Sequence, residues 1–522
     1  MKISILILWL CFFANDFCAQ IIIDLNQNNV NATISNSGTF FNNSSIGVPG
    51  YEVPKNSGKH CVYAASFWYG GMNENDELLM SAQFYQANQD LFPGPYSEND
   101  SYNDPEFESK YNQIWTLTAD QIMDHILHYT DPSYTPPSAI ATWPGNGDAS
   151  LGVSQQLAPF VDVNNDGFYI PEDGDYPDIK GCMASYLILN DASNTHGSGG
   201  AIMGIEVHQM FYQYESDDFL NRSTFVEQRI INRGAENLHD VYTSFFMDAD
   251  IGNYSDDYVG CDSSRNMMFA YNGDANDESM GGIIGYGTET PSLGVVSLSH
   301  NLVGSNSFSS GSSPNTPATI YNVMKGLWAD GSSIYYGGSG VFGDIGVSNT
   351  PTSFTYSDNP NDPSGWSEAT LSNPPGDRRI YMSVYKDTLP SQAEWIQDYV
   401  ILQAPEGSAQ ESVNYLIQKA DSAIVFYQNP SSDCDLFVSI DELNQSNIDV
   451  YPNPSKGDFH ISLPHSMNTS SLKITNTEGR LVYNKMLGQE TEIEISIDQP
   501  AGIYMLNIDN GESILTKKII LK

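Results

Sequence analysis

The chain has 522 residues, enough for a sizeable core and about three domains. Its 64 acidic and 21 basic residues give a formal net charge of −43. This charge argues against binding to nucleic acid or anionic lipid, because both attract Lys and Arg and repel carboxylates. Apolar residues make up 40% of the chain and aromatic residues 12%, which excludes a disordered protein. Polarity comes mainly from Asn, Ser, Gly and Tyr, and therefore favours a mainly β fold with short strands and turns.

Residues 1–19 predict a secretory signal peptide. Lys2 precedes the apolar run ISILILWLCFF, and Ala19 offers a small residue for cleavage. The alternative is a buried strand or helix. No later stretch has 18 consecutive apolar residues, so we expect no membrane span.

Four cysteines remain after this predicted cleavage: Cys61, Cys182, Cys261 and Cys434. An oxidising compartment favours disulfides, and four cysteines allow three pairings. The sequence leaves two outcomes open, two disulfides or buried reduced thiols. No CxxC motif and no Cys/His spacing typical of zinc occurs.

Residues 20–434 predict a large antiparallel β-sandwich-type body with one or two subdomains. Apolar and polar residues alternate between turn clusters over residues 20–115 and 201–250, as in half-buried strands. Residues 287–375 are rich in Gly, Ser, Asn and Pro and predict further short strands. The stretch 130–180 is expected to consist largely of loops.

Two helices are expected in this body. The first covers residues 118–129, where Thr118 and Gln121 have the spacing of a capping box. The second covers residues 409–428. Its apolar residues recur at helical spacing and predict one buried face: Val413, Leu416, Ile417, Ala420 and Ile424.

A linker over residues 435–448 leads to a distinct C-terminal unit, residues 449–522. Six or seven segments of this unit alternate apolar and polar residues, which predicts a small immunoglobulin-like β-sandwich. Four short motifs carry a specific resemblance: Val450-Tyr451-Pro452-Asn453-Pro454, Gly479-Arg480-Leu481-Val482, Ala501-Gly502-Ile503-Tyr504 and the basic, apolar end Lys517-Lys518-Ile519-Ile520-Leu521-Lys522.

This unit resembles the type A sorting domain of the Bacteroidetes type IX secretion system. The resemblance implies export through the periplasm and across the outer membrane, followed by release or surface attachment. It also implies that residues 449–522 contact the secretion machinery. The alternative is an ordinary immunoglobulin-like module, for example one that binds carbohydrate.

The body resembles a group of long Bacteroidetes cargo proteins without an assigned activity. The matching pieces include Tyr51-Glu52-Val53-Pro54, Phe67-Trp68-Tyr69-Gly70-Gly71, Thr224-Phe225, Tyr271-Asn272-Gly273-Asp274 and Gly376-Asp377-Arg378-Arg379. This resemblance implies a class and a location, and no reaction.

Residues 162–173 have the pattern of an EF-hand-like calcium loop. Oxygen-bearing side chains occupy positions 1, 3 and 5, Gly167 allows a sharp turn at position 6, and an acid closes the loop at position 12. The candidate ligands are Asp162, Asn164, Asp166, the carbonyl of Phe168, and Asp173. An EF-hand has Glu at the last position, and Asp there resembles dockerins and thrombospondin-type repeats. We expect a calcium-stabilised surface loop without flanking helices; the alternative is an acidic turn without metal.

A second, weaker candidate for a calcium site is an acidic cluster further along the chain. Its members are Asp248, Asp250, Asp256, Asp257 and Asp262. Carboxylates at this density repel one another unless a cation or hydrogen bonds intervene. The alternative is a solvated acidic loop.

The sequence contains no recognisable catalytic motif. His125 and His128 share a helix face but lack the glutamate and third ligand of a zinc site. Arg378 and Arg379 are more consistent with structural salt bridges than with binding of a substrate carboxylate. The scattered tryptophans favour a core role over a sugar-stacking platform: Trp68, Trp115, Trp143, Trp328, Trp366 and Trp395.

Two functions follow from the sequence. The first is an exported, non-catalytic calcium-binding protein that acts at or beyond the cell surface, with a glycan or surface partner. The second is a secreted hydrolase acting on polysaccharide, whose active-site carboxylates sequence alone does not identify. The sorting motifs and the calcium-type loop favour the first.

Overall fold

The computed structural model describes residues 20–43, 46–85, 89–309, 312–340, 344, 346, 349–430, 434, 449–463, 471–476, 480–488, 491–509 and 514–522. The expected signal peptide and the 435–448 linker lie outside these residues.

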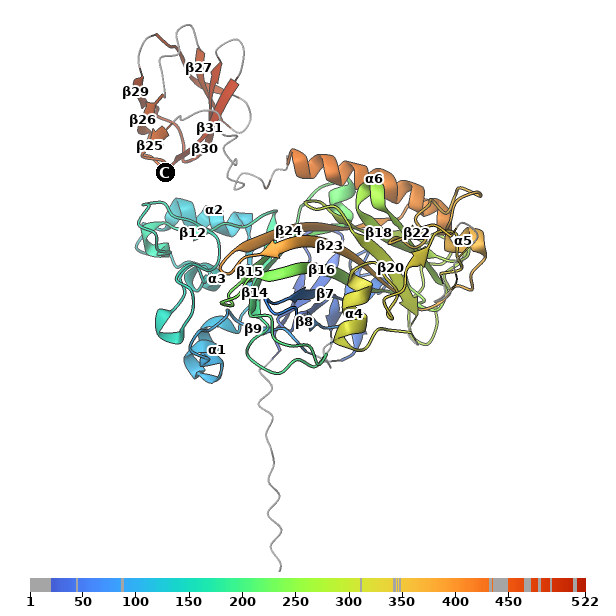
Figure 1. Ribbon diagram of the computed structural model, residues 1–522. Helices are drawn as coiled ribbons and strands as arrows, with labels where there is room; N and C mark the ends of the chain where they lie inside the picture. Colours follow the sequence, from blue (N-terminus) through green and yellow to red (C-terminus); the bar gives the residue numbers. More distant parts are fainter. Residues whose placement is uncertain are drawn as a thin grey trace, which may run out of the picture.

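The body consists of two large antiparallel sheets, as predicted (Figure 1). The first has the order β1 (Ile22–Leu25), β2 (Asn31–Ser35), β6 (Tyr51–Glu52), β7 (His60–Met72), β16 (Leu238–Ala249), β23 (Arg378–Leu389) and β20 (Gly304–Ser309), with β3 (Thr39–Phe40) and β8 (Leu78–Ala82) paired to β7. The second has the order β10 (Trp115–Thr118), β13 (Met183–Asn190), β14 (Ile205–Gln213), β15 (Ser223–Asn232), β24 (Glu394–Ala404), β19 (Ser292–Ser297), β18 (Met267–Asn272) and β17 (Asp257–Asp262), with β9 (Phe92–Pro93) paired to β13. Three short pairs complete the strands of the body: β4 (Asn42–Asn43) with β5 (Val48–Pro49), β11 (Phe160–Val161) with β12 (Tyr176–Pro177), and β21 (Ile334–Tyr335) with β22 (Pro351–Thr352).

The largest hydrophobic core lies between the two sheets. Phe67 of the first sheet and Tyr399 of the second approach with ring centroids 5.4 Å apart, and Phe245 lies 5.7 Å from Tyr399. Alternate residues of β16 enter this core, because successive side chains of a strand point to opposite faces. Each fully buried phenylalanine contributes about 1.5–3 kcal/mol. The intervening β16 residues, including Phe246 and Asp248, therefore face outward.

Helices cover the outer faces of both sheets. Thr118 and Gln121 form the expected capping box, and α2 spans Ala119–His128. The second expected helix is also present as α6 (Ser412–Gln428), which follows a 3₁₀ turn and packs Val413 and Leu416 onto the second sheet. The sequence did not predict α1 (Pro105–Tyr111), α3 (Ser138–Ala141), α4 (Pro317–Met324) and α5 (Glu368–Leu371). No helix among the described residues is long and apolar enough to cross a membrane.

The C-terminal unit is a small antiparallel sandwich with its own core, as predicted. One sheet has the order β25 (Asp449–Tyr451), β26 (Asp458–Ser462) and β29 (Glu492–Ser496), and the other β28 (Leu481–Met486), β27 (Ser471–Asn476), β30 (Gly502–Asp509) and β31 (Ile514–Leu521). Asn453 anchors the last strand, because its side chain donates to the Lys518 carbonyl and accepts from the Ile520 amide. Lys522 contacts the body, because its ammonium donates to the hydroxyl of Tyr129, the residue after α2, at 2.7 Å.

The cysteines match neither outcome in full, because the structure has one disulfide and two buried thiols where the sequence predicted either two disulfides or only thiols. Cys182 and Cys434 form one disulfide, which joins the segment after α6 to the second sheet. Cys61 and Cys261 are buried thiols. Burial raises the pKa of Cys61 to about 11, so this thiol is protonated and unreactive at neutral pH.

Candidate functional site

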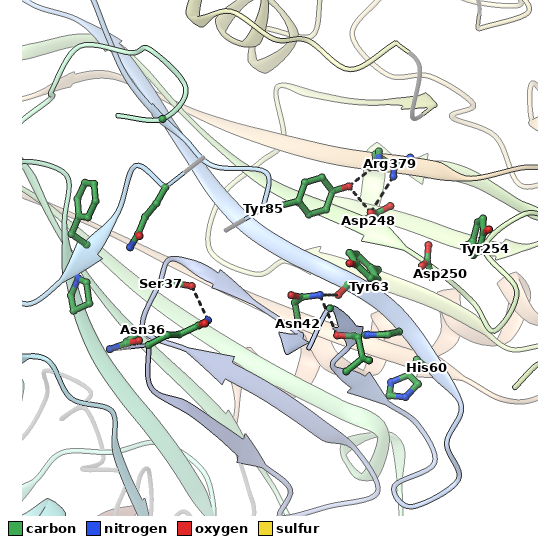
Figure 2. A pocket seen from close by; sticks show the side chains of 18 of the residues that line it. Asn36, Ser37, Asn42, His60, Tyr63, Tyr85, Asp248, Asp250, Tyr254 and Arg379 are labelled. Atoms are coloured by element: carbon green, nitrogen blue, oxygen red, sulfur yellow. Dashed lines mark hydrogen bonds and ion pairs between the residues drawn. The ribbon is translucent and has the colours of Figure 1, made fainter. Parts of the chain in front are cut away.

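A large cleft opens along the first sheet and the loops beside it (Figure 2). Its volume is about 2060 Å³, roughly twice the upper end of small-molecule pockets at about 1,000 Å³. Aromatic rings contribute to its walls: Tyr63, Tyr85, Phe92, Tyr102, Phe107 and Tyr254. A cleft of this size and composition suits an extended polar ligand.

Acidic side chains meet at one end of this cleft. Asp248, Asp250 and Asp377 each offer a carboxylate oxygen, and these three oxygens lie within 4.8 Å of one another. Asp248 is almost fully buried, whereas Asp250 and Asp377 are half-buried and line the cleft. Figure 2 shows the Asp248 and Asp250 side chains next to each other, beside Tyr85 and Arg379. Within the described residues, this is the group of three His, Cys, Asp or Glu residues that satisfies the geometry of a metal site.

Strand register brings these residues together. Asp248 on β16 lies directly opposite Arg379 on β23. Asp250 follows Asp248 by two residues, and Asp377 precedes Arg379 by two. In an antiparallel pair, residues two apart point to the same face, so all four side chains share the outer face of the first sheet.

A hydrogen-bonded network holds the Asp248 carboxylate in place. The Tyr85 hydroxyl donates to Asp248 Oδ2 at 2.5 Å and accepts from Arg379 Nε at 2.9 Å. Arg379 Nη2 lies 3.4 Å from Asp248 Oδ2, and Arg379 Nη1 donates to Asp377 Oδ1 at 2.7 Å. Phe246, next to this network, stacks on Trp68 in the aromatic cluster outside the first sheet. The network therefore lies beside a packed aromatic cluster.

One guanidinium does not neutralise three carboxylates. Burial raises the pKa of Asp248 to about 6, although Arg379 and Tyr85 oppose the shift. Burial, and then the charges of Asp248 and Asp377, raise the pKa of Asp250 well above its ordinary value. Asp248 Oδ1 is buried and has no hydrogen-bond partner among the described residues. These carboxylates are therefore strained electrostatically unless a proton or a cation joins them.

The predicted calcium loop forms a hairpin closed by β11 and β12, with no α-helix on either side. The Asp162 carboxylate accepts from the amides of Asp166 and Gly167, at 3.3 and 2.7 Å. The Asn164 amide lies 3.1 Å from Asp166 Oδ2 and 3.4 Å from Asp173 Oδ2. The loop thus curls around its oxygen-bearing side chains.

Asp175 holds this loop from beneath. It is fully buried, and its carboxylate accepts from the amides of Val163 and Ile170, both at 2.8 Å. Burial, with a smaller effect of the Asp162 and Asp166 charges, raises the pKa of Asp175. Phe168, whose carbonyl is the candidate seventh-position ligand, is exposed, as expected for a surface loop.

The structure divides the second predicted acidic cluster into separate parts. Asp248 and Asp250 join Asp377 in the cleft. Asp262 instead caps the 3₁₀ turn that follows β17 and pairs with Arg265 at 2.8 Å. Asp256 and Asp257 lie near Asp277. Burial is the largest cause that raises the pKa of both, and the negative charge of Asp277 adds to it. Together, burial and this charge raise the pKa of Asp256 to about 7.

The remaining sequence candidates make contacts within the body. His125 is buried with its Nε2 3.0 Å from the Asp175 carbonyl, whereas His128 pairs with Asp124, so the two side chains have separate partners. Arg378 forms an ion pair with the buried Glu368 at 3.0 Å. Five of the six tryptophans are at most 4% exposed and Trp328 is partly buried, which confirms their core role.

Sequence reasoning missed Asp377 and Tyr85 as members of the cleft site. In the sequence, Asp377 stands beside Arg378 and Arg379 and far from Asp248 and Asp250. The available signal was the two-residue spacing shared by Asp248-Ala-Asp250 and Asp377-Arg-Arg379, which is typical of residues on one strand face. Tyr85 carried no local signal.

The C-terminal unit matches a known protein family. Residues 449–522 match the family described as the secretion system C-terminal sorting domain. This unit is a type IX secretion sorting domain. The sorting domain directs the protein through the periplasm to the cell surface or the extracellular space, and implies contact with the type IX machinery. No match was found among curated proteins.

Three solved structures resemble the chain distantly. A polysaccharide lyase shares 9% identity, with 70% of this chain and 37% of the lyase covered and a TM-score of 0.19. The adhesin domain of Epf from Streptococcus pyogenes shares 10% identity, with 59% and 81% covered and a TM-score of 0.13. PorZ, a surface component of the type IX secretion system of Porphyromonas gingivalis, shares 12%, with 66% and 44% covered and a TM-score of 0.13. At these scores the likenesses support no inference about the body.

Proposed function

We propose that this sorting-domain protein binds calcium and acts without catalysis at or beyond the cell surface, in adhesion, matrix formation or glycan contact. The observation that carries the calcium assignment is the loop of residues 162–173. Its oxygen-bearing side chains occur at the spacing that Ca²⁺ requires, and its backbone amides orient them. The large cleft supports a role in binding an extended partner such as a glycan.

The loop assignment is tested with the mature chain, residues 20–522. Removal of calcium with EDTA should lower the melting temperature, and added Ca²⁺ should restore it. Asp166→Ala should weaken calcium binding at least tenfold in isothermal titration, because it removes a charged ligand. Asp178→Ala, a change outside the loop ligands, is the matched control. Equal effects of the two variants would show a response to bulk charge, and an unchanged melting curve without calcium in elemental analysis would refute the assignment.

A secreted hydrolase acting on polysaccharide is the second candidate. The cleft favours it, since carboxyl groups with raised pKa values are typical of general acids. The distances between the carboxylates of Asp248, Asp250 and Asp377 favour cation binding instead. One oxygen of each lies within 4.8 Å of the others, whereas glycosidases separate their two carboxyl groups by about 5–10 Å. Release of reducing ends from polysaccharide, abolished by Asp250→Asn and retained in EDTA, would establish the hydrolase.

A further inference from the structure

We propose that Asp248, Asp250 and Asp377 bind a second calcium ion in the cleft, and that this ion binds vicinal hydroxyl groups of a glycan. This inference deepens the proposed glycan-binding role. It does not depend on the calcium loop, which lies on a different part of the body.

The geometry of the three carboxylates fits one ion. Calcium holds oxygen ligands at about 2.3–2.6 Å, so two ligands on opposite sides of the ion lie about 5 Å apart. The three carboxylate oxygens lie within 4.8 Å of one another and therefore fit around one such ion.

One buried oxygen of this group lacks a partner in the described part of the chain. Asp248 is 3% exposed, and its Oδ1 has no hydrogen-bond partner among the described residues. Its Oδ2 is held by Tyr85 and Arg379. A buried charged oxygen left without a partner is costly by about 1–3 kcal/mol or more. A cation between Asp248 and Asp250 removes this cost.

The local charge matches a divalent ion. When all three carboxyl groups are ionised, as ligands of a cation are, the guanidinium of Arg379 leaves two negative charges in this part of the cleft. The Asp250 carboxylate and Asp377 Oδ2 accept no hydrogen bond from the described residues, so they remain available as ligands. Oxygen ligands of this kind suit calcium, which tolerates irregular geometry better than magnesium does.

The protein does not complete the coordination shell. Calcium takes about six to eight oxygens. The oxygens that are not engaged by Arg379 or Tyr85 number four at most: Asp248 Oδ1, both of Asp250, and Asp377 Oδ2. The remaining positions face the cleft, because Asp250 and Asp377 line it. Two adjacent hydroxyl groups of a sugar fill such positions, while Tyr63 and Tyr254 offer rings for the rest of the glycan.

Two variants separate the cleft site from the loop site. Calcium titration of the mature chain should give two bound ions, with one lost in Asp250→Asn and the other lost in Asp166→Asn. If only Asp250→Asn loses an ion, the loop assignment fails and the cleft site stands. If Asp250→Asn binds as many ions as the parent protein, the cleft site is refuted.

The glycan is tested by affinity electrophoresis in gels containing yeast mannan, alginate or xylan. At least one polysaccharide should retard the parent protein in CaCl₂. EDTA and Asp250→Asn should abolish this retardation, and Asp166→Asn should leave it in place. Retardation that persists in EDTA, or no retardation by any of the three, would overturn the proposed role of the ion in glycan binding.

Discussion

Asp248→Asn offers a direct test of the electrostatics in the cleft. Asparagine has the same shape as aspartate but does not ionise. The folded protein raises the pKa of Asp248 from 3.8 to about 6 through burial. At about 1.4 kcal/mol per pKa unit, this shift corresponds to about 3 kcal/mol.

The sign of the effect follows from proton linkage. A raised pKa means that the folded state holds the proton more tightly than the unfolded chain does. The stability that this proton contributes is fully present below about pH 4 and is lost as the pH rises from 3.8 to about 6. The Asn variant has no such loss. In EDTA, the variant should therefore gain about 3 kcal/mol relative to the parent protein between pH 4 and pH 7.5.

Calorimetry of the mature chain measures this difference. For a body of about 415 residues, an unfolding entropy of about 2.1 cal/mol/K per residue converts 3 kcal/mol into about 3 °C of melting temperature. Asp217→Asn, at an exposed position, is the control and should follow the parent at every pH. At pH 7.5, added calcium should stabilise the parent protein more than the Asn variant, because only the parent keeps all three carboxylate ligands. Parallel curves for Asp248→Asn and the parent in EDTA would refute the reasoning.

Two further predictions concern export and the thiols. Deletion of residues 449–522 should leave the protein in the periplasm, as judged by fractionation and immunoblotting, and normal export of this truncation would contradict the sorting role. Mass spectrometry without reduction should find one linked peptide pair, Cys182 with Cys434, while Cys61 and Cys261 should react with iodoacetamide only after unfolding. A disulfide that includes Cys61 or rapid alkylation of the native protein would show that the cysteines are arranged differently.

Local patterns in the sequence determined much of this protein. The capping box at Thr118 placed α2, because it depends on residues three apart. Period-two alternation predicted the small sandwich of residues 449–522, and the sorting motifs in that unit predicted export. The oxygen spacing in residues 162–173 likewise depends on neighbours in the chain, so the proposal of a calcium loop needed only the sequence.

Only the tertiary structure decided the cleft. Asp377 meets Asp248 and Asp250 because β16 and β23 pair in a particular register, and this register depends on the packing of two whole sheets. Tyr85 joins them from another part of the chain, and the disulfide from Cys182 to Cys434 spans 252 residues. Contacts between distant segments leave little trace in local composition. The acidic residues were therefore visible in the sequence, but which of them share one site was decided by the fold.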